Sequence, residues 1–297
     1  MESLRGSRAR ADAPAVIVPV YNAVDALTEC LESLLPTLRA DVPLLLADDA
    51  SPDPRIRPLL ESLPARHPGL NIRVMRQSCN LGFVGNCIAA VDACPGRDVV
   101  LLNSDTRVTP GWIEQLAQCA ASDPAIATIT PWSNNAEICS YPKFCVANPM
   151  PEADEAACIA DAAAELADEA PVDLPTGVGF AMWIRRSAWD TLGGFDAATF
   201  GRGYGEENDF CRRAAAHGWR NVLCPSAYVA HRGHASFAET GHKPGGENLA
   251  RLTHRYPDYN HLVADFIARD PLHELRARLD EALARRGGRL EHLASRD

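Results

Sequence analysis

Short apolar runs alternate with helical patterns along the first part of the chain. The apolar runs, each of strand length, cover residues 15–20, 44–47, 71–75, 98–102 and 125–130. After the first run, Leu27, Leu31, Leu34 and Leu38 recur at the spacing of one helical face, and helical patterns also follow the later runs. This alternation predicts an α/β fold in which helices cover both faces of a mainly parallel sheet.

The carboxyl ends of the predicted strands are the places to look for a ligand site, because ligands of such sheets bind there. The loops that follow these ends are rich in Asn, Asp and Gly and cover residues 19–22, 48–53, 80–86 and 103–106. We therefore treat these loops as candidate binding segments.

The pattern changes after residue 150. The segment 150–170 is acidic and rich in Ala, and we expect a solvated helix or a mobile insertion there. Strand-like runs return at 177–184 and at 220–228. The second half should therefore add strands to the sheet around a segment that carries no chemistry.

The C-terminal part is polar and then helical. Leu272, Leu275, Leu279 and Leu283 form an apolar stripe, which is typical of a helix that docks on the rest of the protein. The sequence thus predicts a disordered tail over 1–13, one large domain over 14–240 and a helical extension over 241–297.

Composition narrows the classes of function. The chain has 297 residues and a formal net charge of -10, which argues against nucleic acid or an anionic membrane as the main partner. No apolar run approaches the roughly 20 residues that a membrane span needs. The ten cysteines include no C-x-x-C pair. We therefore expect reduced thiols in a cytoplasmic protein.

Two adjacent carboxylates stand where a Gly-rich turn leads into a predicted helix. They are Glu206 and Glu207 in the segment G-Y-G-E-E-N-D-F over 203–210. The helix dipole favours negative charge in a first turn, so we expect both groups to be ionised near neutral pH. A fixed carboxylate beside a flexible turn suits a general base that acts on a hydroxyl, although carboxylates are also common first-turn residues without chemistry.

A candidate metal site follows the strand at 98–102. Asp105, in the sequence N-S-D, is well placed to bind a hard divalent cation, although the same three residues also suit a plain turn. His231 could supply a nitrogen ligand to this ion, which would favour manganese over magnesium. His234, three residues later, is a competing candidate.

The earlier loops offer groups for a nucleotide. Asp48 and Asp49 could accept hydrogen bonds from a base or a ribose, and the turn at 19–22 supplies an aromatic ring and an amide. The loop N-L-G-F-V-G-N over 80–86 opens a helix and suits the approach of a diphosphate or a base. It is neither a P-loop nor the G-x-G-x-x-G fingerprint, which weighs against a nicotinamide or flavin enzyme.

Together these motifs resemble family-2 glycosyltransferases with the GT-A fold. The resemblance rests on the order P-V-Y-N, D-D-A-S, N-L-G-F, N-S-D, G-G-F-D, G-Y-G-E-E-N-D-F, H-R-G-H-A-S-F and runs from about residue 14 to 237. It implies a GT-A catalytic domain over 14–240, with a nucleotide-binding half over 14–131 and an acceptor-binding half over 132–240.

The resemblance also implies roles for single residues. Glu207 matches the usual base, with Glu in place of Asp, and Asp105 and His231 match the metal site, with Asn103 at the first position of the family's D-x-D motif. The implied nucleotide ligands are Pro19, Tyr21, Asn22, Asp48, Asp49, Asn80, Gly82, Asn86 and Ser104. The implied acceptor ligands are Glu206, Asp209, Trp132 and Asn134.

The implied reaction is inverting transfer of a sugar from a UDP or dTDP sugar to a hydroxyl. The cofactor would be Mn²⁺ or Mg²⁺, and the acceptor a glycan or a lipid-linked saccharide of bacterial surface polysaccharide. The chain would then meet the membrane at most peripherally. Whether it forms a homo-oligomer is left open.

Alternative functions share part of this pattern. A nucleotidyltransferase would need a basic, Gly-rich phosphate loop near the first strand, which residues 18–23 do not provide. A non-catalytic sugar-nucleotide sensor would need neither Glu207 nor His231. A retaining transferase would leave the opposite anomer in the product.

Overall fold

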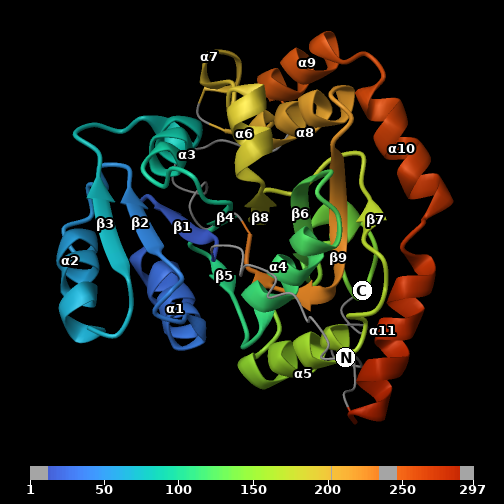
Figure 1. Ribbon diagram of the computed structural model, residues 1–297, viewed down its shortest axis with the longest axis horizontal. Coiled ribbons are helices and arrows are strands. Elements are labelled where there is room, and N and C mark those ends of the chain that lie inside the picture. The colour runs from blue at the N-terminus through green and yellow to red at the C-terminus, as the bar shows by residue number, and fades with distance from the viewer. Residues whose placement is uncertain (1–12, 202, 234–245, 288–297) are drawn as a thin grey trace, which may run out of the picture.

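The computed structural model describes residues 13–201, 203–233 and 246–287. Within these residues, eight strands form one sheet in the order β3-β2-β1-β4-β8-β6-β9-β7 (Figure 1). The strands are β1 (Ala15–Val20), β2 (Leu44–Asp48), β3 (Ile72–Arg76), β4 (Val99–Leu102), β6 (Ile126–Trp132), β7 (Val172–Asp173), β8 (Ala181–Ile184) and β9 (Arg220–Tyr228). The predicted tail over 1–13 lies, except for Ala13, outside the described residues.

The sheet is mixed rather than uniformly parallel. Strands β3, β2, β1 and β4 pair in parallel, as do β6 and β9. Strand β8 runs antiparallel between β4 and β6, and β7 runs antiparallel to β9. A short ribbon of β5 (Thr106–Arg107) and β10 (Ala230–His231) lies apart from the sheet. The predicted α/β class is confirmed, with β8 joining the two parallel parts.

Helices cover both faces of the sheet because successive side chains of its strands point to opposite sides. In β1, Val16 and Val18 join one apolar cluster, while Ala15 and Ile17 join the other. The first cluster includes residues of α1 (Val24–Leu34), α2 (Ile56–Arg66), α4 (Trp112–Ser122) and α5 (Ala153–Ala164). The second includes residues of α3 (Gly82–Asp92), α6 (Arg186–Leu192) and α8 (Glu206–Ala216).

The segment 150–170 differs from the expected solvated helix or mobile insertion. Its helix α5 buries Ala156, Ile159, Ala162 and Ala163 and packs against β9 and α11 (His273–Arg285). Small side chains let α5 approach its neighbours closely, while Asp154 and Asp161 are exposed. The helix of the first alternative is present, but it is docked rather than solvated, because an Ala-rich face that looks weakly apolar in sequence packs well.

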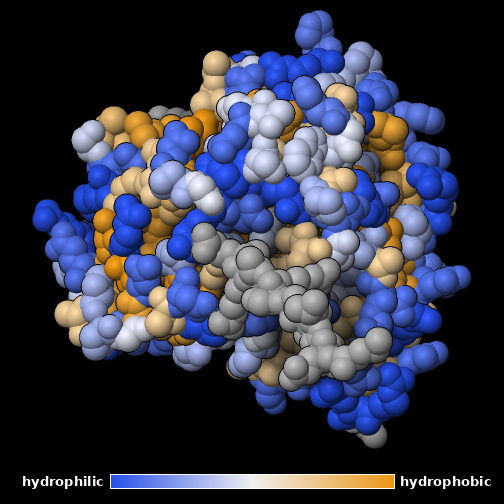
Figure 2. Space-filling model, in the orientation of Figure 1, coloured by the Kyte–Doolittle hydropathy of each residue, from blue (hydrophilic) through white to orange (hydrophobic). Residues whose placement is uncertain are grey.

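The C-terminal helices wrap one side of the molecule. Helices α9 (Gly246–Arg255), α10 (Tyr259–Arg269) and α11 run down the right of Figure 1, and α9 contacts the short helix α7 (Ala197–Phe200). Leu272, Leu275, Leu279 and Leu283 are all buried, so the predicted docking stripe is confirmed. Figure 2 shows hydrophilic residues over the opposite, outer face of α11.

Candidate active site

A cavity of about 260 Å³ opens where the two halves of the chain meet. Its walls come from the ends of β1, β2 and β4, the start of α3, the residues before β8, the start of α8 and the strand β10. The predicted site residues that line it are Pro19, Tyr21, Asp49, Asn80, Gly82, Asn86, Ser104, Asp105, Glu206, Glu207 and His231. The strand-end loops thus face the segment that carries Glu207 across one space.

The cavity holds a candidate cation site of Asp105 and His231. The ribbon of β5 and β10 brings them together, and Nε2 of His231 lies 3.5 Å from Oδ1 of Asp105. Nδ1 of His231 lies 2.8 Å from the carbonyl oxygen of Asn135. Because a carbonyl only accepts, Nδ1 carries a hydrogen, and in the neutral imidazole the lone pair of Nε2 faces Asp105. His234, the competing candidate, lies outside the described residues.

The imidazole of His231 is held firmly in this orientation. The side-chain amide of Asn134 donates to the carbonyl oxygen of His231 at 2.9 Å and accepts from its backbone N–H at 2.8 Å. Phe180 stacks on the ring, with centroids 5.1 Å apart. A fixed imidazole nitrogen beside a carboxylate suits manganese or a similar divalent ion.

The charge of the cavity also fits a cation. Among the described residues that line it, Asp49, Asp105, Glu137, Glu206 and Glu207 carry carboxyl groups and none is Lys or Arg. Without a cation, an anionic phosphate ligand would be repelled by the ionised carboxylates of the lining. The described residues contain no group of three or more His, Cys, Asp or Glu side chains that could hold a metal ion, so we expect other oxygen ligands, including those of substrate and water, to complete the coordination.

Glu206 and Glu207 begin α8 at a strained turn. Gly205 adopts a φ of 108°, and a Cβ there would lie 2.9 Å from the ring of Phe200, so only glycine fits. The backbone N–H of Gly205 donates to Oε2 of Glu207 at 3.3 Å. The side chain of Glu207 also faces Gly179, whose missing side chain leaves room beside the carboxylate.

The expectation that both carboxylates are ionised needs correction. Burial raises the pKa of Glu206 and of Glu207. The hydrogen bond between the two groups raises the pKa of Glu206 further and partly offsets the increase for Glu207. Glu206 therefore holds a proton more tightly, and Glu207 is the one that ionises first. Desolvation outweighs the helix dipole that the sequence argument relied on.

Asp49 and Asn86 shape the loop at the start of α3. Oδ1 of Asp49 accepts from the backbone N–H of Leu81 at 2.7 Å. The side-chain amide of Asn86 donates to the carbonyl oxygen of Ala47 at 2.7 Å and accepts from Nε2 of Gln77 at 3.1 Å. These bonds fix the residues of the 80–86 loop that line the cavity.

Asp48 and Asn22 do not line the cavity, contrary to their expected role as nucleotide ligands. Asp48 is buried and ion-paired with Arg76, and its Oδ1 accepts from the backbone N–H of Ser51 at 2.9 Å. Asn22 accepts from the backbone N–H of Asp53 at 3.2 Å. Both side chains hold the turn together, and Asp49 is the aspartate that reaches the cavity.

Trp132 and Asn134 also lie outside the cavity lining, contrary to their expected contact with an acceptor. Trp132 is fully buried and its indole N–H donates to the carbonyl oxygen of Pro225 at 3.1 Å. Asn134 is buried and holds the backbone of His231. Trp132 ends β6 and Asn134 follows in the next loop, and both side chains are buried away from the cavity lining.

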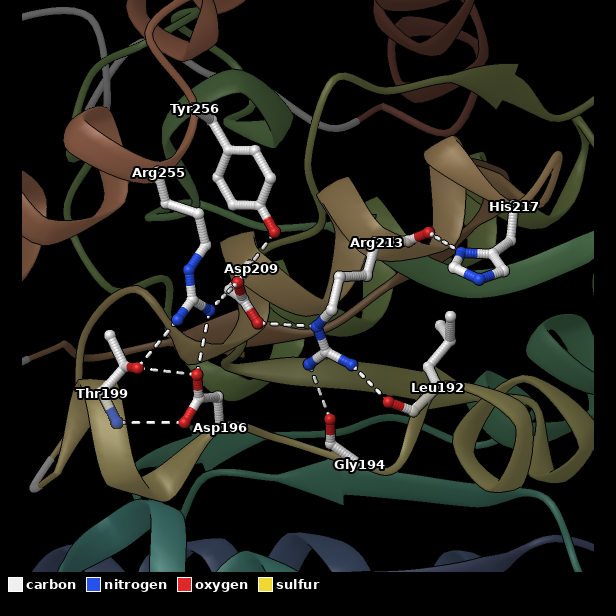
Figure 3. Close-up of polar contacts among 9 residues, drawn as sticks. All are labelled: Leu192, Gly194, Asp196, Thr199, Asp209, Arg213, His217, Arg255 and Tyr256. Atoms are coloured by element: carbon white, nitrogen blue, oxygen red, sulfur yellow. Dashed lines mark hydrogen bonds and ion pairs between the residues drawn. The ribbon is translucent and has the colours of Figure 1, made fainter.

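Asp209 was expected to bind the acceptor, but it is fully buried in a network of polar side chains (Figure 3). Its Oδ2 accepts from Nε of Arg213 at 2.8 Å, and its Oδ1 accepts from Nη1 of Arg255 at 2.7 Å and from the hydroxyl of Tyr256 at 2.9 Å. Residues two apart on a helix face different directions, so Asp209 cannot share the cavity with Glu207. It ties α8 to α9.

Asp209→Asn is expected to lower the free energy of unfolding by about 3 kcal/mol, because it leaves two arginines without their buried anion. Urea denaturation measures this. Asp258→Asn is the matched control, since Asp258 pairs with Arg212 of the same helix but is 55% exposed; its effect should stay below about 1 kcal/mol. Equal small effects in both variants would contradict the structural role of Asp209.

Glu137 and Tyr204 line the cavity but were not selected from the sequence. Tyr204 has a φ of 66°, and burial and nearby carboxylates raise its pKa to about 12. Its position in G-Y-G-E-E, directly before the two glutamates, was a usable signal. Glu137 lies in a loop after β6 with no recognisable motif, so the sequence offered no signal for it.

Known proteins match this chain in sequence and in fold. Residues 15–144 match the family described as "Glycosyl transferase family 2". An N-acetylglucosaminyl-diphospho-decaprenol L-rhamnosyltransferase of Mycobacterium tuberculosis is 27% identical over 240 residues, which cover 73% of this chain and 75% of that protein.

Two solved structures show that the fold is GT-A. GalNAc-T7 with UDP, GalNAc and Mn²⁺ matches with a TM-score of 0.63 and 15% identity over 92% of this chain, which spans only 55% of that chain. The mannosyltransferase PcManGT of Pyrobaculum calidifontis with GDP-Man and Mn²⁺ matches with a TM-score of 0.56 and 15% identity, covering 97% of this chain and 77% of that one.

Proposed function

This chain is a glycosyltransferase with a GT-A fold and a glycosyl transferase family 2 segment at residues 15–144, and we propose that it is an inverting enzyme that uses a nucleoside diphosphate sugar. The observation that carries the proposal is that Glu207 lines the same cavity as Asp105, His231 and the strand-end loops. A candidate base and a candidate cation site thus line one cavity, which supports the proposal.

In the proposed reaction, the acceptor oxygen forms a bond to the anomeric carbon while the bond from that carbon to the diphosphate breaks. The electron pair leaves with the nucleoside diphosphate, and Glu207 takes the proton of the attacking hydroxyl. Attack from the side opposite the leaving group inverts the anomeric centre. The raised pKa of Glu207 makes it a stronger base than an exposed glutamate.

Asp105 and Nε2 of His231 would hold a divalent cation. When bound there, the cation neutralises charge on the diphosphate. The acidic lining of the cavity supports this role, because the described lining residues include no Lys or Arg to do the same work. On the nucleotide side, Asp49 and Asn80 are the side chains that we expect to meet the base and ribose.

The sequence relative supports a choice of substrates to test. Because that relative is named for L-rhamnose transfer to N-acetylglucosaminyl-diphospho-decaprenol, we propose a diphospholipid-linked saccharide as acceptor and a dTDP or UDP sugar as donor, with L-rhamnose as the first sugar to test. Within the described residues, no helix has the length and apolar character to cross a bilayer. The enzyme would meet such an acceptor at the membrane surface.

A binding panel followed by turnover tests this function. UDP or dTDP should raise the melting temperature much more with Mn²⁺ than with EDTA, and mass spectrometry should detect transfer from the sugar nucleotide that binds best. The acceptor is a synthetic N-acetylglucosaminyl diphosphate with a short isoprenoid chain. Binding with neither transfer nor donor hydrolysis would identify a sensor. Release of pyrophosphate from a nucleoside triphosphate would identify a nucleotidyltransferase. A product that NMR shows to have the retained anomer would identify a retaining enzyme.

A further inference from the structure

The loop over 133–148, between β6 and α5, is a rigid part of the cavity wall. The side-chain amide of Asn148 donates to the carbonyl oxygens of Asn134, Lys143 and Val146, each at 3.0 Å. The backbone N–H of Lys143 donates in return to Oδ1 of Asn148 at 3.2 Å. The base of this loop also holds His231 through Asn134, so the loop and the candidate cation site share one support.

Glu137 is the strained residue of this loop. Its φ is 48°, a left-handed value that is uncommon for a residue other than glycine, asparagine or aspartate. Its carbonyl oxygen accepts from the backbone N–H groups of Ser140 and Cys145, and both sequence neighbours are buried, so the conformation is fixed from several sides. Strain held in place beside a cavity points to a functional role.

The carboxylate of Glu137 has no partner of its own in the described part of the chain. No described residue forms a hydrogen bond or an ion pair with it, although it lines the cavity. An ionised carboxylate can only accept hydrogen bonds, so its ligand must be a donor. Sugar hydroxyls are neutral donors, whereas the diphosphate of a donor nucleotide would be repelled.

Glu137 lies on the side of the cavity where the base is. The side chain of Glu137 is exposed, and it lines the cavity together with Glu207 and Gly179. Its charge contributes to the raised pKa of Glu207. The base must touch the attacking hydroxyl, so a carboxylate within its electrostatic reach lies near the acceptor.

We propose that Glu137 binds the acceptor sugar by accepting hydrogen bonds from hydroxyls beside the one that attacks, and that it thereby selects the acceptor. This inference rests on the proposed glycosyl transfer. The mechanism does not otherwise use Glu137. A site that binds a hydroxyl discriminates against an analogue without it, because the carboxylate then loses its hydrogen-bond donor in the complex.

Glu137→Gln is expected to lower kcat/KM for the acceptor by about 10- to 100-fold, the effect of losing a charged hydrogen bond, mainly through KM. The KM for the sugar nucleotide and the rate of donor hydrolysis without acceptor should stay within twofold of the parent. The acceptor is the synthetic N-acetylglucosaminyl diphosphate lipid. In the parent, its deoxy analogues should have a lower kcat/KM than the full acceptor, and this difference should disappear in Glu137→Gln.

Glu137→Gly separates this role from a structural one. Glycine adopts a positive φ without strain, so the variant should melt at the parent temperature or higher. Its kcat/KM for the acceptor should fall as it does in Glu137→Gln. Glu152→Gln, an exposed glutamate near the end of the same connection, is the matched control and should keep the parent kinetics.

The outcomes distinguish this inference from the proposed function. An unchanged acceptor KM in both Glu137 variants overturns the inference while transfer by the parent stands. An equal rise in the KM for the sugar nucleotide assigns Glu137 to the donor and overturns it as well. Failure of both variants to fold shows a structural carboxylate. If the parent neither transfers nor hydrolyses any sugar nucleotide, the proposed function itself fails.

Discussion

Glu207→Gln is expected to lower kcat for transfer by about 10²–10⁴-fold, the usual contribution of a general base. Glutamine keeps the shape of the side chain and its hydrogen bond from the backbone N–H of Gly205, but it cannot take a proton. Nucleotide affinity in Mn²⁺ should stay within about twofold, because the cation site lies on other elements. Calorimetry and initial rates on the same preparations check both statements.

Glu206→Gln is the matched control for this variant. Because Glu206 holds its proton more tightly, glutamine resembles its existing state, and the loss of kcat should stay below about 10-fold. Equal losses in the two variants would contradict the separate roles of the pair. A parallel loss of nucleotide binding in Glu207→Gln would show that this residue is structural or a donor ligand.

The pH profile of kcat gives an independent reading of Glu207. The base must be ionised to act, and burial raises its pKa above the ordinary 4.5. Activity should therefore fall as the pH drops through a midpoint above 4.5, and this acid limb should be missing from the residual activity of Glu207→Gln. An acid limb that survives the substitution would assign it to another group.

Asp105→Asn is expected to weaken nucleotide binding in Mn²⁺ by at least about 100-fold, since even groups that only support a metal ligand change metal affinity by 10–100-fold. Asparagine keeps an oxygen but removes the charge that faces Nε2 of His231. In EDTA the variant and the parent should bind nucleotide equally weakly. Titration calorimetry with UDP measures the nucleotide affinity in Mn²⁺ and in EDTA. Electron paramagnetic resonance measures the binding of Mn²⁺.

Asp92→Asn is the matched control for Asp105→Asn. Asp92 is exposed at the end of α3, away from the cavity lining, and its variant should bind Mn²⁺ and UDP as the parent does. Unchanged Mn²⁺-dependent binding in Asp105→Asn would remove Asp105 from the site. A loss of the same size in EDTA would show damage to the fold instead.

The sequence could predict the strand-end loops because turn chemistry and hydrophobic periodicity are local. The apolar runs marked the strands to within a few residues, and the loops after β1, β2 and β4 reached the cavity as expected. It could not decide which side chain of each loop faces inward. Asp48 and Asp49 are neighbours, yet one pairs with Arg76 and the other lines the cavity.

Direction also explains why Asp209, which was expected to bind the acceptor, does not line the cavity. Asp209 belongs to the same short motif as Glu207, but the turn of the helix sends it to Arg213 and Arg255. A resemblance to a family assigns roles to a motif as a whole. The direction in which each side chain of the helix points, and the residues that it meets there, decide which members of the motif line the cavity and which hold the fold together.

By itself, the sequence determined the α/β class, the positions of most strands and the motifs of a glycosyltransferase, because each depends on residues close together in the chain. Only the tertiary structure decided that Asp105 faces His231, that Glu137 shares the cavity with Glu207, and that Glu206 keeps its proton more tightly than its neighbour. The contacts and burial that produce these results come from segments far apart in sequence, which no local pattern records.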